Sequence, residues 1–274
     1  MTYDRGGERR LGALHQGRVI DLPDAVGHPA FPPTMEALVA RNGGTTLDAA
    51  REAFEHDDVL EFAVDDARLL VPILPASLRD FLAFEDHVRR GAERRGTPVP
   101  DAWYEIPVYY KGNHRTVIGP EEVLPWPPFT EKLDFELEVA CILGKPGRDL
   151  SEDQAAARIF GYTVMNDWSA RDLQAREMSA WLGPAKSKDF ATSLGPCVVT
   201  ADEFDPSDCR LSARVDGEVW AEGNLKEMRW SFPQMVAYVS QGEDVEAGDV
   251  YGSGTFGGGC GLDLGRFLHP GAEV

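Results

Sequence analysis

The chain has 274 residues, of which 43% are hydrophobic, and it carries a formal net charge of −19. The apolar content is ample for a buried core, and the acidic balance without a Lys/Arg cluster excludes nucleic acid and an anionic membrane surface as expected partners. No segment reaches the roughly 18 apolar residues of a membrane span, no apolar signal region follows the N-terminus, and the four cysteines have no paired spacing, so we expect a reduced, cytosolic protein.

Residues 1–72 are predicted to form a small α+β lobe. LGALHQGRVIDL is typical of two short strands around a glycine turn. TMEALVARNG and LDAAREAFEHDD follow with helical periodicity that ends at glycine or at acidic residues. A larger domain is expected over residues 73–274.

The segment VPILPASLRDFLAFEDHVRRGAERRG predicts a strand, a proline break and then a helix from about Ser77. Asp80 and His87 are seven residues apart, which is two helical turns, so a continuous helix would present both on one face. A histidine among acids is either a surface residue, the commoner case, or a general base oriented by a carboxylate.

In LDFELEVACILG, residues 133–144, acidic and apolar residues alternate before a continuous apolar run. Alternation puts Asp134, Glu136 and Glu138 on one face of a strand, whereas ACILG is typical of a strand buried on both faces. The carboxylates are therefore either solvated or held in a dry site that supplies a cation. Two glutamates at i and i+2 suit a hard cation such as Mg²⁺ or Ca²⁺.

From Glu105 onward, short apolar runs bounded by Gly, Pro or Asp predict a mainly β domain. LSARVDGEVWAEG predicts a hairpin with Asp216-Gly217 as its turn. Helices are expected at SEDQAAARIF, where Ser151 and Gln154 suit a capping box, at SARDLQAREM and around FPQMVAYVS. FLHPGAEV predicts a turn and the first residues of a further strand, so we expect the natural chain to continue.

Two segments present polar residues where elements end. GYTVMNDWSARDLQ predicts a strand that delivers Asn166 and Asp167 to the start of a helix, where Asp167 is either a ligand or, more commonly for a lone aspartate, the helix N-cap. GPAKSKDFATSLGP predicts a loop that offers Lys186, Lys188 and Thr192, each either substrate-binding or solvated.

Taken in order, RDFLAFEDHV, YYKG, LDFELEVACILG, MNDWSARDLQ, KSKDF and GSGT resemble the motifs of the fumarylacetoacetate hydrolase family, over roughly residues 70–265. The resemblance implies an α+β fold with a mixed β-roll as catalytic domain, usually assembled as a homodimer, for which residues 232–250 are a candidate contact. It implies Glu136, Glu138 and Asp167 as ligands of Mg²⁺, with Ca²⁺ or Mn²⁺ as the other candidate ions, and Asp80 as a fourth carboxylate.

By the same resemblance, His87 matches the general base and Lys188 a catalytic residue beside the metal. The substrate-binding residues would be Tyr110, Lys111, Arg171, Gln174, Thr192 and Thr255. The chain also departs from the family: Met178 and Leu82 stand where the namesake hydrolase has tyrosines, so fumarylacetoacetate itself is not the expected substrate. Arg90 stands where many smaller members have a glutamate. The carboxylate that orients His87 is therefore Glu85, Asp86 or Asp263.

Members of the family share one chemical plan, in which a divalent cation chelates a 2-oxo acid or 1,3-diketone and stabilises the enolate formed as a C–C bond breaks. We therefore expect a hydrolase of acylpyruvates or diketo acids that uses water activated by His87. The alternatives are an isomerase, hydratase or decarboxylase of 2-oxo acids, and an inactive member that only binds a ligand. The last is disfavoured because the expected metal-binding and catalytic residues are all present.

Overall fold

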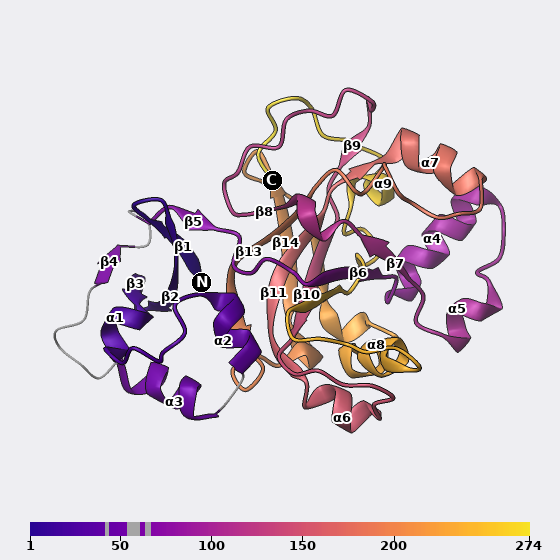
Figure 1. Ribbon diagram of the computed structural model, residues 1–274. Helices are drawn as coiled ribbons and strands as arrows, with labels where there is room; N and C mark the ends of the chain where they lie inside the picture. The colour runs from indigo at the N-terminus through magenta and orange to yellow at the C-terminus, as the bar shows by residue number, and fades with distance from the viewer. Residues whose placement is uncertain (42–43, 54–60, 64–66) are drawn as a thin grey trace.

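The computed structural model describes residues 1–41, 44–53, 61–63 and 67–274, which form two large sheets and two two-stranded sheets, with helices around them (Figure 1). The smaller sheet has the strand order β4-β3-β2-β1-β5. Its strands are β1 (Thr2–Arg5), β2 (Glu8–His15), β3 (Arg18–Asp21), β4 (Glu61–Ala63) and β5 (Leu69–Leu70). The helices of this lobe are α1 (Leu22–Val26), α2 (Met35–Arg41) and α3 (Gly44–Glu52).

The strand, turn and strand predicted at LGALHQGRVIDL are β2 and β3, which pair antiparallel from Gly12↔Asp21 to His15↔Arg18. The two helices predicted next are α2 and α3. Residues 54–58, the end of the second predicted helix, lie outside the described residues.

A buried carboxylate joins β1, β2 and α1. Asp21 is fully buried and caps α1 by accepting from the backbone N–H of Asp24 at 3.0 Å. It also accepts from the Tyr3 hydroxyl, from Arg5 at 3.0 Å and from Arg10 at 2.6 and 3.0 Å. Burial alone would raise the pKa of Asp21, but the hydrogen bonds from Arg10, Tyr3 and Asp24 bring it below its ordinary value.

We expect Asp21→Asn to lower the free energy of unfolding by about 2–4 kcal/mol, because it leaves Arg10 without its buried carboxylate. Since folding lowers the pKa of Asp21, this stabilisation is complete above about pH 4 and is lost as the pH falls through the folded-state pKa. Chemical unfolding followed by circular dichroism at neutral and acidic pH measures both effects. Asp24→Asn is the control, because the Asp24 side chain is 45% exposed and should contribute less than about 1 kcal/mol. Equal losses in the two variants would contradict a special role for the buried carboxylate.

The larger sheet is mixed and has seven strands, in the order β7-β6-β16-β10-β11-β13-β8. β6 pairs parallel with β16, and β13 pairs parallel with β8, while the other neighbours are antiparallel. The strands are β6 (Ser77–Phe81), β7 (Tyr109–Gly112), β8 (Val117–Ile118), β10 (Leu137–Leu143), β11 (Ile159–Asp167), β13 (Thr192–Thr200) and β16 (Asp249–Gly252). This mixed sheet with few helices agrees with the predicted α+β fold.

The run ACILG lies at the centre of the larger sheet, as predicted. It belongs to β10, which lies between β11 and β16 and is buried along its whole length. Residues 139, 141 and 143 contribute to an apolar cluster with α8 (Phe232–Ser240), whereas residues 140 and 142 face a second cluster that includes Leu11, Met35 and Leu38 of the N-terminal lobe. The two lobes therefore share apolar packing, and a domain boundary at residues 72/73 stays a prediction.

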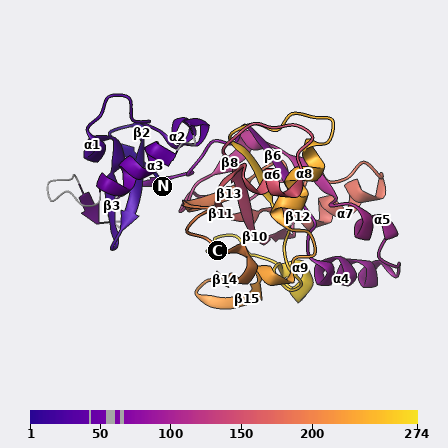
Figure 2. The same cartoon turned by 90° about the horizontal axis from the view of Figure 1, so that it is seen from below.

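The helices of the larger part are α4 (Glu85–Arg95), α5 (Asp101–Glu105), α6 (Glu152–Ala156), α7 (Arg171–Ser179), α8 (Phe232–Ser240) and α9 (Gly261–Leu264). Two of them, α6 and α8, begin at a capping box, whereas the other four have no side-chain cap. The capping box of Ser151 and Gln154 is present at α6. Helix α8 packs against α6 (Figure 2). Most apolar side chains of α8 are buried. The apolar face of α8 is therefore core, and a contribution of residues 232–250 to a dimer contact stays a prediction.

The helix predicted from about Ser77 begins only at Glu85. Residues 77–81 form β6 instead, which pairs with β16 from Ser77↔Asp249 to Asp80↔Gly252. Pairing and burial inside a sheet outweigh a weak local preference for helix, which is why periodicity misled here. Asp80 therefore lies near the end of a strand, and His87 lies in the first turn of α4.

The predicted hairpin is formed by β14 (Arg210–Val215) and β15 (Glu218–Asn224). Asp216 and Gly217 both have positive φ, 51° and 80°, as a two-residue turn of this kind requires. The C-terminal residues lie against this turn, because the backbone N–H of Glu273 donates to Asp216 at 3.0 Å. Residues 267–274 form no strand, so the strand start predicted in FLHPGAEV is wrong.

Two expectations about the chain's environment can be compared with the described residues. None of their helices is long and apolar enough to cross a membrane. All four cysteines are free thiols, as predicted from their spacing.

Candidate active site

Four buried carboxylates from separate parts of the larger sheet converge on one point. Asp80 comes from β6, Glu138 from β10 and Asp167 from the end of β11, while Glu136 precedes β10. One oxygen of each lies within 4.8 Å of the others, and all four residues are buried. The two glutamates of the ExE motif therefore do point to one place.

A glycine makes room for this carboxylate group. Strand β16 runs between β6 and β10, and it contributes Gly252 beside Asp80. A Cβ at Gly252 would lie 2.7 Å from Asp80 Oδ1 and 2.9 Å from Glu138 Oε2. Gly254 donates its backbone N–H to Glu138 Oε2 at 2.9 Å. The GSGT motif thus shapes the site through its backbone, a role that sequence reasoning had not assigned to it.

Two cationic side chains lie against Glu136. Lys188 Nζ donates to Glu136 Oε2 and to Asp167 Oδ2, at 2.5 Å each, and Arg171 Nη2 donates to Glu136 Oε1 at 2.7 Å. Burial alone would raise the pKa of Glu136, but Arg171 and Lys188 hold it below its ordinary value. Burial would likewise lower the pKa of Lys188, but Asp167 and Glu136 raise it. Glu136 and Lys188 are therefore both charged.

The other three carboxylates have more negative charge than their surroundings neutralise. Burial and neighbouring carboxylates raise the pKa of Asp167, and raise those of Asp80 and Glu138 well above the ordinary range. One buried oxygen of each has no hydrogen-bond partner among the described residues: Asp80 Oδ1, Glu138 Oε1 and Asp167 Oδ1. Unpartnered buried oxygens are costly unless a cation or donor satisfies them. The donor set is oxygen only, which fits a hard divalent ion such as Mg²⁺, Mn²⁺ or Ca²⁺.

Asp167 does not cap the helix that follows it. Helix α7 begins at Arg171 and has Ala170 at its N-cap, without a side-chain cap. The alternative reading of Asp167 as an N-cap is therefore wrong, and its carboxylate is free for the group described above.

Asp134 is buried but lies outside the carboxylate group. Strand β9 (Leu133–Asp134) pairs with β12 (Ser169–Ala170) in a separate ribbon, so the chain does not continue as one straight strand into β10. Asp134 accepts from Arg171 Nε at 2.7 Å and from the backbone N–H groups of Gly261 and Leu262 at 2.7 and 2.9 Å. It therefore fixes both Arg171 and the start of α9.

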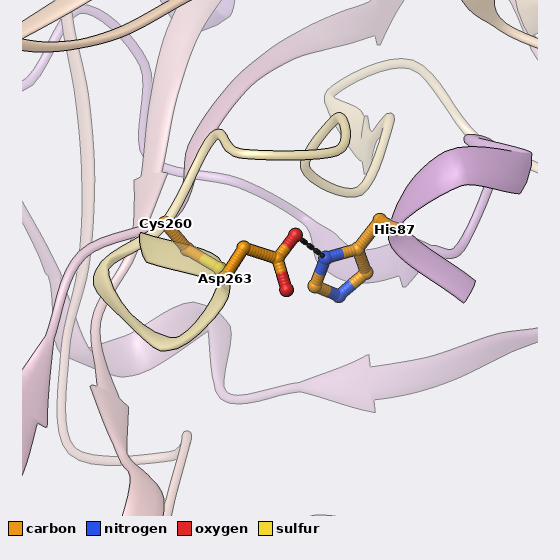
Figure 3. A group of neighbouring side chains, drawn as sticks. All are labelled: His87, Cys260 and Asp263. Atoms are coloured by element: carbon orange, nitrogen blue, oxygen red, sulfur yellow. Dashed lines mark hydrogen bonds and ion pairs between the residues drawn. The ribbon is translucent and has the colours of Figure 1, made fainter. Parts of the chain in front are cut away.

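His87 is paired with Asp263, the first-turn acid of α9 (Figure 3). His87 Nδ1 lies 2.9 Å from Asp263 Oδ2. Asp263 also accepts from the backbone N–H of Gly258 at 3.0 Å and from Arg94 at 2.7 Å. Although burial would raise the pKa of Asp263, these hydrogen bonds lower it to about 2. A charged carboxylate at Nδ1 holds the proton there and leaves Nε2 as the basic nitrogen.

Of the three carboxylates that the sequence left open as partners of His87, the structure pairs it with Asp263. Glu85 instead accepts from the Tyr104 hydroxyl at 2.9 Å, and Asp86 pairs with Arg89 and Arg90. The ring of His87 lies within 4.8 Å of the Cys260 thiol, and Cys260 is bridged to Glu136 through the backbone, so the histidine lies near the carboxylate group.

Most of the expected substrate-binding residues surround these groups. The Tyr110 hydroxyl donates to Asp167 Oδ2 at 2.6 Å, and Gln174 Oε1 accepts from Arg171 Nη1 at 3.0 Å. Thr192 is buried opposite Asp167 on β13, and buried Thr255 donates to the carbonyl of Leu137 at 3.0 Å.

Three residues that the sequence singled out lie away from the site. Lys111 is exposed on β7, where alternation turns it away from the face of Tyr110. Lys186 is exposed as well, with its ammonium group over the ring of Phe129, and Met178 is 51% exposed. The role of Lys111 stays a prediction that this geometry does not favour.

One hollow on the described surface lies away from the carboxylates. It measures about 600 Å³ and lies beside β11 and β13, near both the 119–126 segment and the C-terminal residues. Trp126, Val164 and Trp168 are among its lining residues. Val164 is 48% exposed there, although most of β11 is buried.

The geometry agrees with what comparison with known proteins finds. Residues 77–274 match the family described as fumarylacetoacetate (FAA) hydrolase C-terminal. Oxaloacetate tautomerase YisK of Bacillus subtilis is 31% identical over 220 residues, which cover 78% of this chain and 70% of that protein. The solved fumarylacetoacetate hydrolase of Exiguobacterium antarcticum superposes with a TM-score of 0.77 at 27% identity, over 99% of this chain and 91% of that one.

A more distant structure has the same fold. It is maleylpyruvate hydrolase from Sphingobium sp. SYK-6, in complex with manganese(II) ion and pyruvate, with a TM-score of 0.72 at 21% identity. The comparison covers 99% of this chain and 92% of that one.

Proposed function

Because the chain belongs to the fumarylacetoacetate hydrolase family, we propose that it is a metal-dependent hydrolase that cleaves a C–C bond of an acylpyruvate or related diketo acid. The observation that carries this proposal is a histidine with its own buried carboxylate, His87 and Asp263, close to the group of four carboxylates. A hydrolase needs both a cation site and a positioned base for water.

Glu136, Glu138 and Asp167 would hold a divalent cation, with Asp80 as the fourth carboxylate. The unpartnered oxygens and the oxygen-only donor set support this assignment. Mg²⁺ and Mn²⁺ are the first candidates, and Mn²⁺ is the ion named for the Sphingobium hydrolase. When bound, the cation would act as a Lewis acid on the oxygens of a 2-oxo acid substrate.

His87 would act as the general base. Its Nδ1–H donates to Asp263, so Nε2 can take a proton from a water molecule, and the Asp263 charge stabilises the imidazolium that forms. The water oxygen adds to the acyl carbonyl carbon, and the C–C bond then breaks. Its electron pair passes to the 2-oxo acid fragment, whose carbon is protonated in turn as the histidine returns to its neutral form.

Lys188 and Arg171 would keep Glu136 in place and offer positive charge at the edge of the site, where the carboxylate of a 2-oxo acid needs a partner. We propose that Tyr110, Gln174, Thr192 and Thr255 complete the substrate pocket.

A second candidate is an oxaloacetate tautomerase, because a relative of that name is 31% identical over most of the chain. Such a reaction moves a proton between carbon and oxygen and adds no water, so it can use the same histidine without breaking a C–C bond.

Assays of acylpyruvates, oxaloacetate and unsaturated 2-oxo diacids with Mg²⁺ or Mn²⁺ separate the two candidate functions. Release of pyruvate and a carboxylic acid from an acylpyruvate would support the hydrolase. Conversion of enol to keto oxaloacetate, with no cleavage of any acylpyruvate, would support the tautomerase and contradict the leading proposal. We also propose that the enzyme is cytosolic.

We predict that the protein is a homodimer. The hollow beside β11 and β13, with Val164 and the two tryptophans along it, is an apolar surface that a second copy would cover. Light scattering at micromolar concentration should give twice the monomer mass of 30.1 kDa. A mass near 30.1 kDa for the full-length protein would rule the dimer out.

A further inference from the structure

A second set of metal-ligand side chains lies next to the carboxylate group and has a different chemistry. His87, Cys260 and Asp263 each offer one ligand atom, and these three atoms lie within 4.8 Å of one another. Figure 3 shows the Asp263 carboxylate between the imidazole ring and the thiol. The set combines nitrogen, sulfur and oxygen, whereas the four carboxylates offer oxygen only.

We propose that His87, Cys260 and Asp263 form a second cation site, which takes a borderline thiophilic ion such as Zn²⁺ and inhibits the enzyme when occupied. Zn²⁺ binds Cys sulfur, His nitrogen and Asp oxygen at about 2.0–2.3 Å in a tetrahedron, and a site with three protein ligands leaves the fourth position to water. His87 Nδ1 and Asp263 Oδ2 are already 2.9 Å apart, near the spacing of two ligands on such an ion. Small side-chain rotations are therefore enough to form the site.

The backbone fixes two of the three ligands. Cys260 is the N-cap residue of α9 and Asp263 lies in its first turn. Cys260 also forms a backbone bridge with Glu136, and its side chain is fully buried. The Asp263 side chain is 0% exposed, whereas that of His87 is 13% exposed. His87 therefore forms the open side through which an ion would enter.

The two oxygens of Asp263 can be divided between Arg94 and an ion. Arg94 bonds the other oxygen of Asp263, Oδ1, at 2.7 Å from a side chain that is 37% exposed. It can keep that oxygen while Oδ2 turns to the ion.

Occupation of this site would remove the basic nitrogen of His87. If the ion binds Nδ1, the single proton of the neutral ring must move to Nε2, and Nε2 can then accept no proton from water. If the ion binds Nε2, it occupies the lone pair that would otherwise accept that proton. Inhibition therefore rests on the proposed role of His87, whereas binding of the ion does not.

Cobalt absorption tests binding without any turnover. The enzyme is first saturated with Mg²⁺, which avoids sulfur ligands, and is then titrated with Co²⁺ as the spectroscopic substitute for Zn²⁺. We expect a near-ultraviolet thiolate-to-cobalt band that saturates at one equivalent and is absent from Cys260→Ala. Cys209→Ala, which removes a half-buried thiol outside the group, should keep the band. Absence of the band from the wild type, or its persistence in Cys260→Ala, would overturn the site.

Zn²⁺ inhibition of the Mg²⁺-saturated enzyme tests the consequence. Cys260→Ala should keep the basal rate but need at least about tenfold more Zn²⁺ for half inhibition, in line with the loss of one ligand. Circular dichroism and thermal unfolding of the variant confirm that it is folded. Equal Zn²⁺ sensitivity of the variant and the wild type would overturn the inhibitory role, even where the proposed hydrolase reaction holds.

Discussion

Glu138→Ala is expected to abolish turnover and to remove the stabilisation that divalent cations give to the wild-type protein. Glu138 is fully buried in the central strand and has one unpartnered oxygen, and its other oxygen is held by the N–H of Gly254. Loss of this ligand should weaken Mg²⁺ or Mn²⁺ binding and lower kcat by about 10³-fold or more, since Lewis-acid stabilisation of a transition state contributes several kcal/mol.

The folded state should survive this substitution. Without a cation, burial and then repulsion from Asp80, Asp167 and Glu136 raise the pKa of Glu138, so the apo protein holds this carboxyl group at a cost that the substitution removes. We expect the apo variant to unfold at the wild-type temperature or above, and to show no rise in Tm with Mn²⁺. Glu138→Gln, which keeps the shape of the side chain, should behave in the same way. Glu131→Ala is the control, because it removes an exposed carboxylate near the same strand and should change neither turnover nor the Tm response to Mn²⁺. A Tm rise with Mn²⁺ in Glu138→Ala equal to that of the wild type would show that the cation binds elsewhere.

The sequence predicted this part of the site well because its residues lie in short, regular motifs. Glu136 and Glu138 are two residues apart and are followed by an unbroken apolar run, which is typical of a strand buried on both faces. Carboxylates next to such a strand are shielded from solvent, so they require a cation or hydrogen-bond donors. Asp134 shows the limit of the same rule. It lies two residues before Glu136, so a continuous strand would place it on the same face as the two glutamates. The chain leaves the larger sheet between β9 and β10, however, and the alternation of faces holds only where the strand continues.

Other parts of the site depend on contacts between residues distant in the sequence. Asp80 was predicted on a helix, because local periodicity does not reveal that β16 pairs with this segment 172 residues later. Asp263 was only one of three candidate partners for His87, since its distance of 176 residues gives no local signal. Gly252 was assigned no role, because the need for a missing Cβ arises only once Asp80 and Glu138 face each other across β16. The folded topology, rather than the composition, brings these residues together.

His87→Ala should separate hydrolysis from the other reactions of the family. Water near Mg²⁺ is much less acidic than water on Zn²⁺, so the cation alone is a poor source of hydroxide at neutral pH, and a positioned base is required. His87 is the proposed base, and its Nδ1 lies 2.9 Å from Asp263 Oδ2. We expect the variant to lower kcat on an acylpyruvate by about 10²-fold or more, the usual contribution of a general base.

Cation binding should be unchanged in His87→Ala, because the histidine does not belong to the group of four carboxylates that we propose as the metal site. The Tm rise with Mn²⁺ therefore serves as the internal control, and His114→Ala, which removes an exposed histidine, should keep the wild-type rate. Asp263→Asn should lower the rate as well, since a neutral amide no longer holds the proton on Nδ1 and cannot stabilise the imidazolium. Decarboxylation of oxaloacetate requires no attacking water, so His87→Ala should keep much of any such activity. If it hydrolyses acylpyruvates at the wild-type rate, the base lies elsewhere and the hydrolase proposal loses the observation on which it was built.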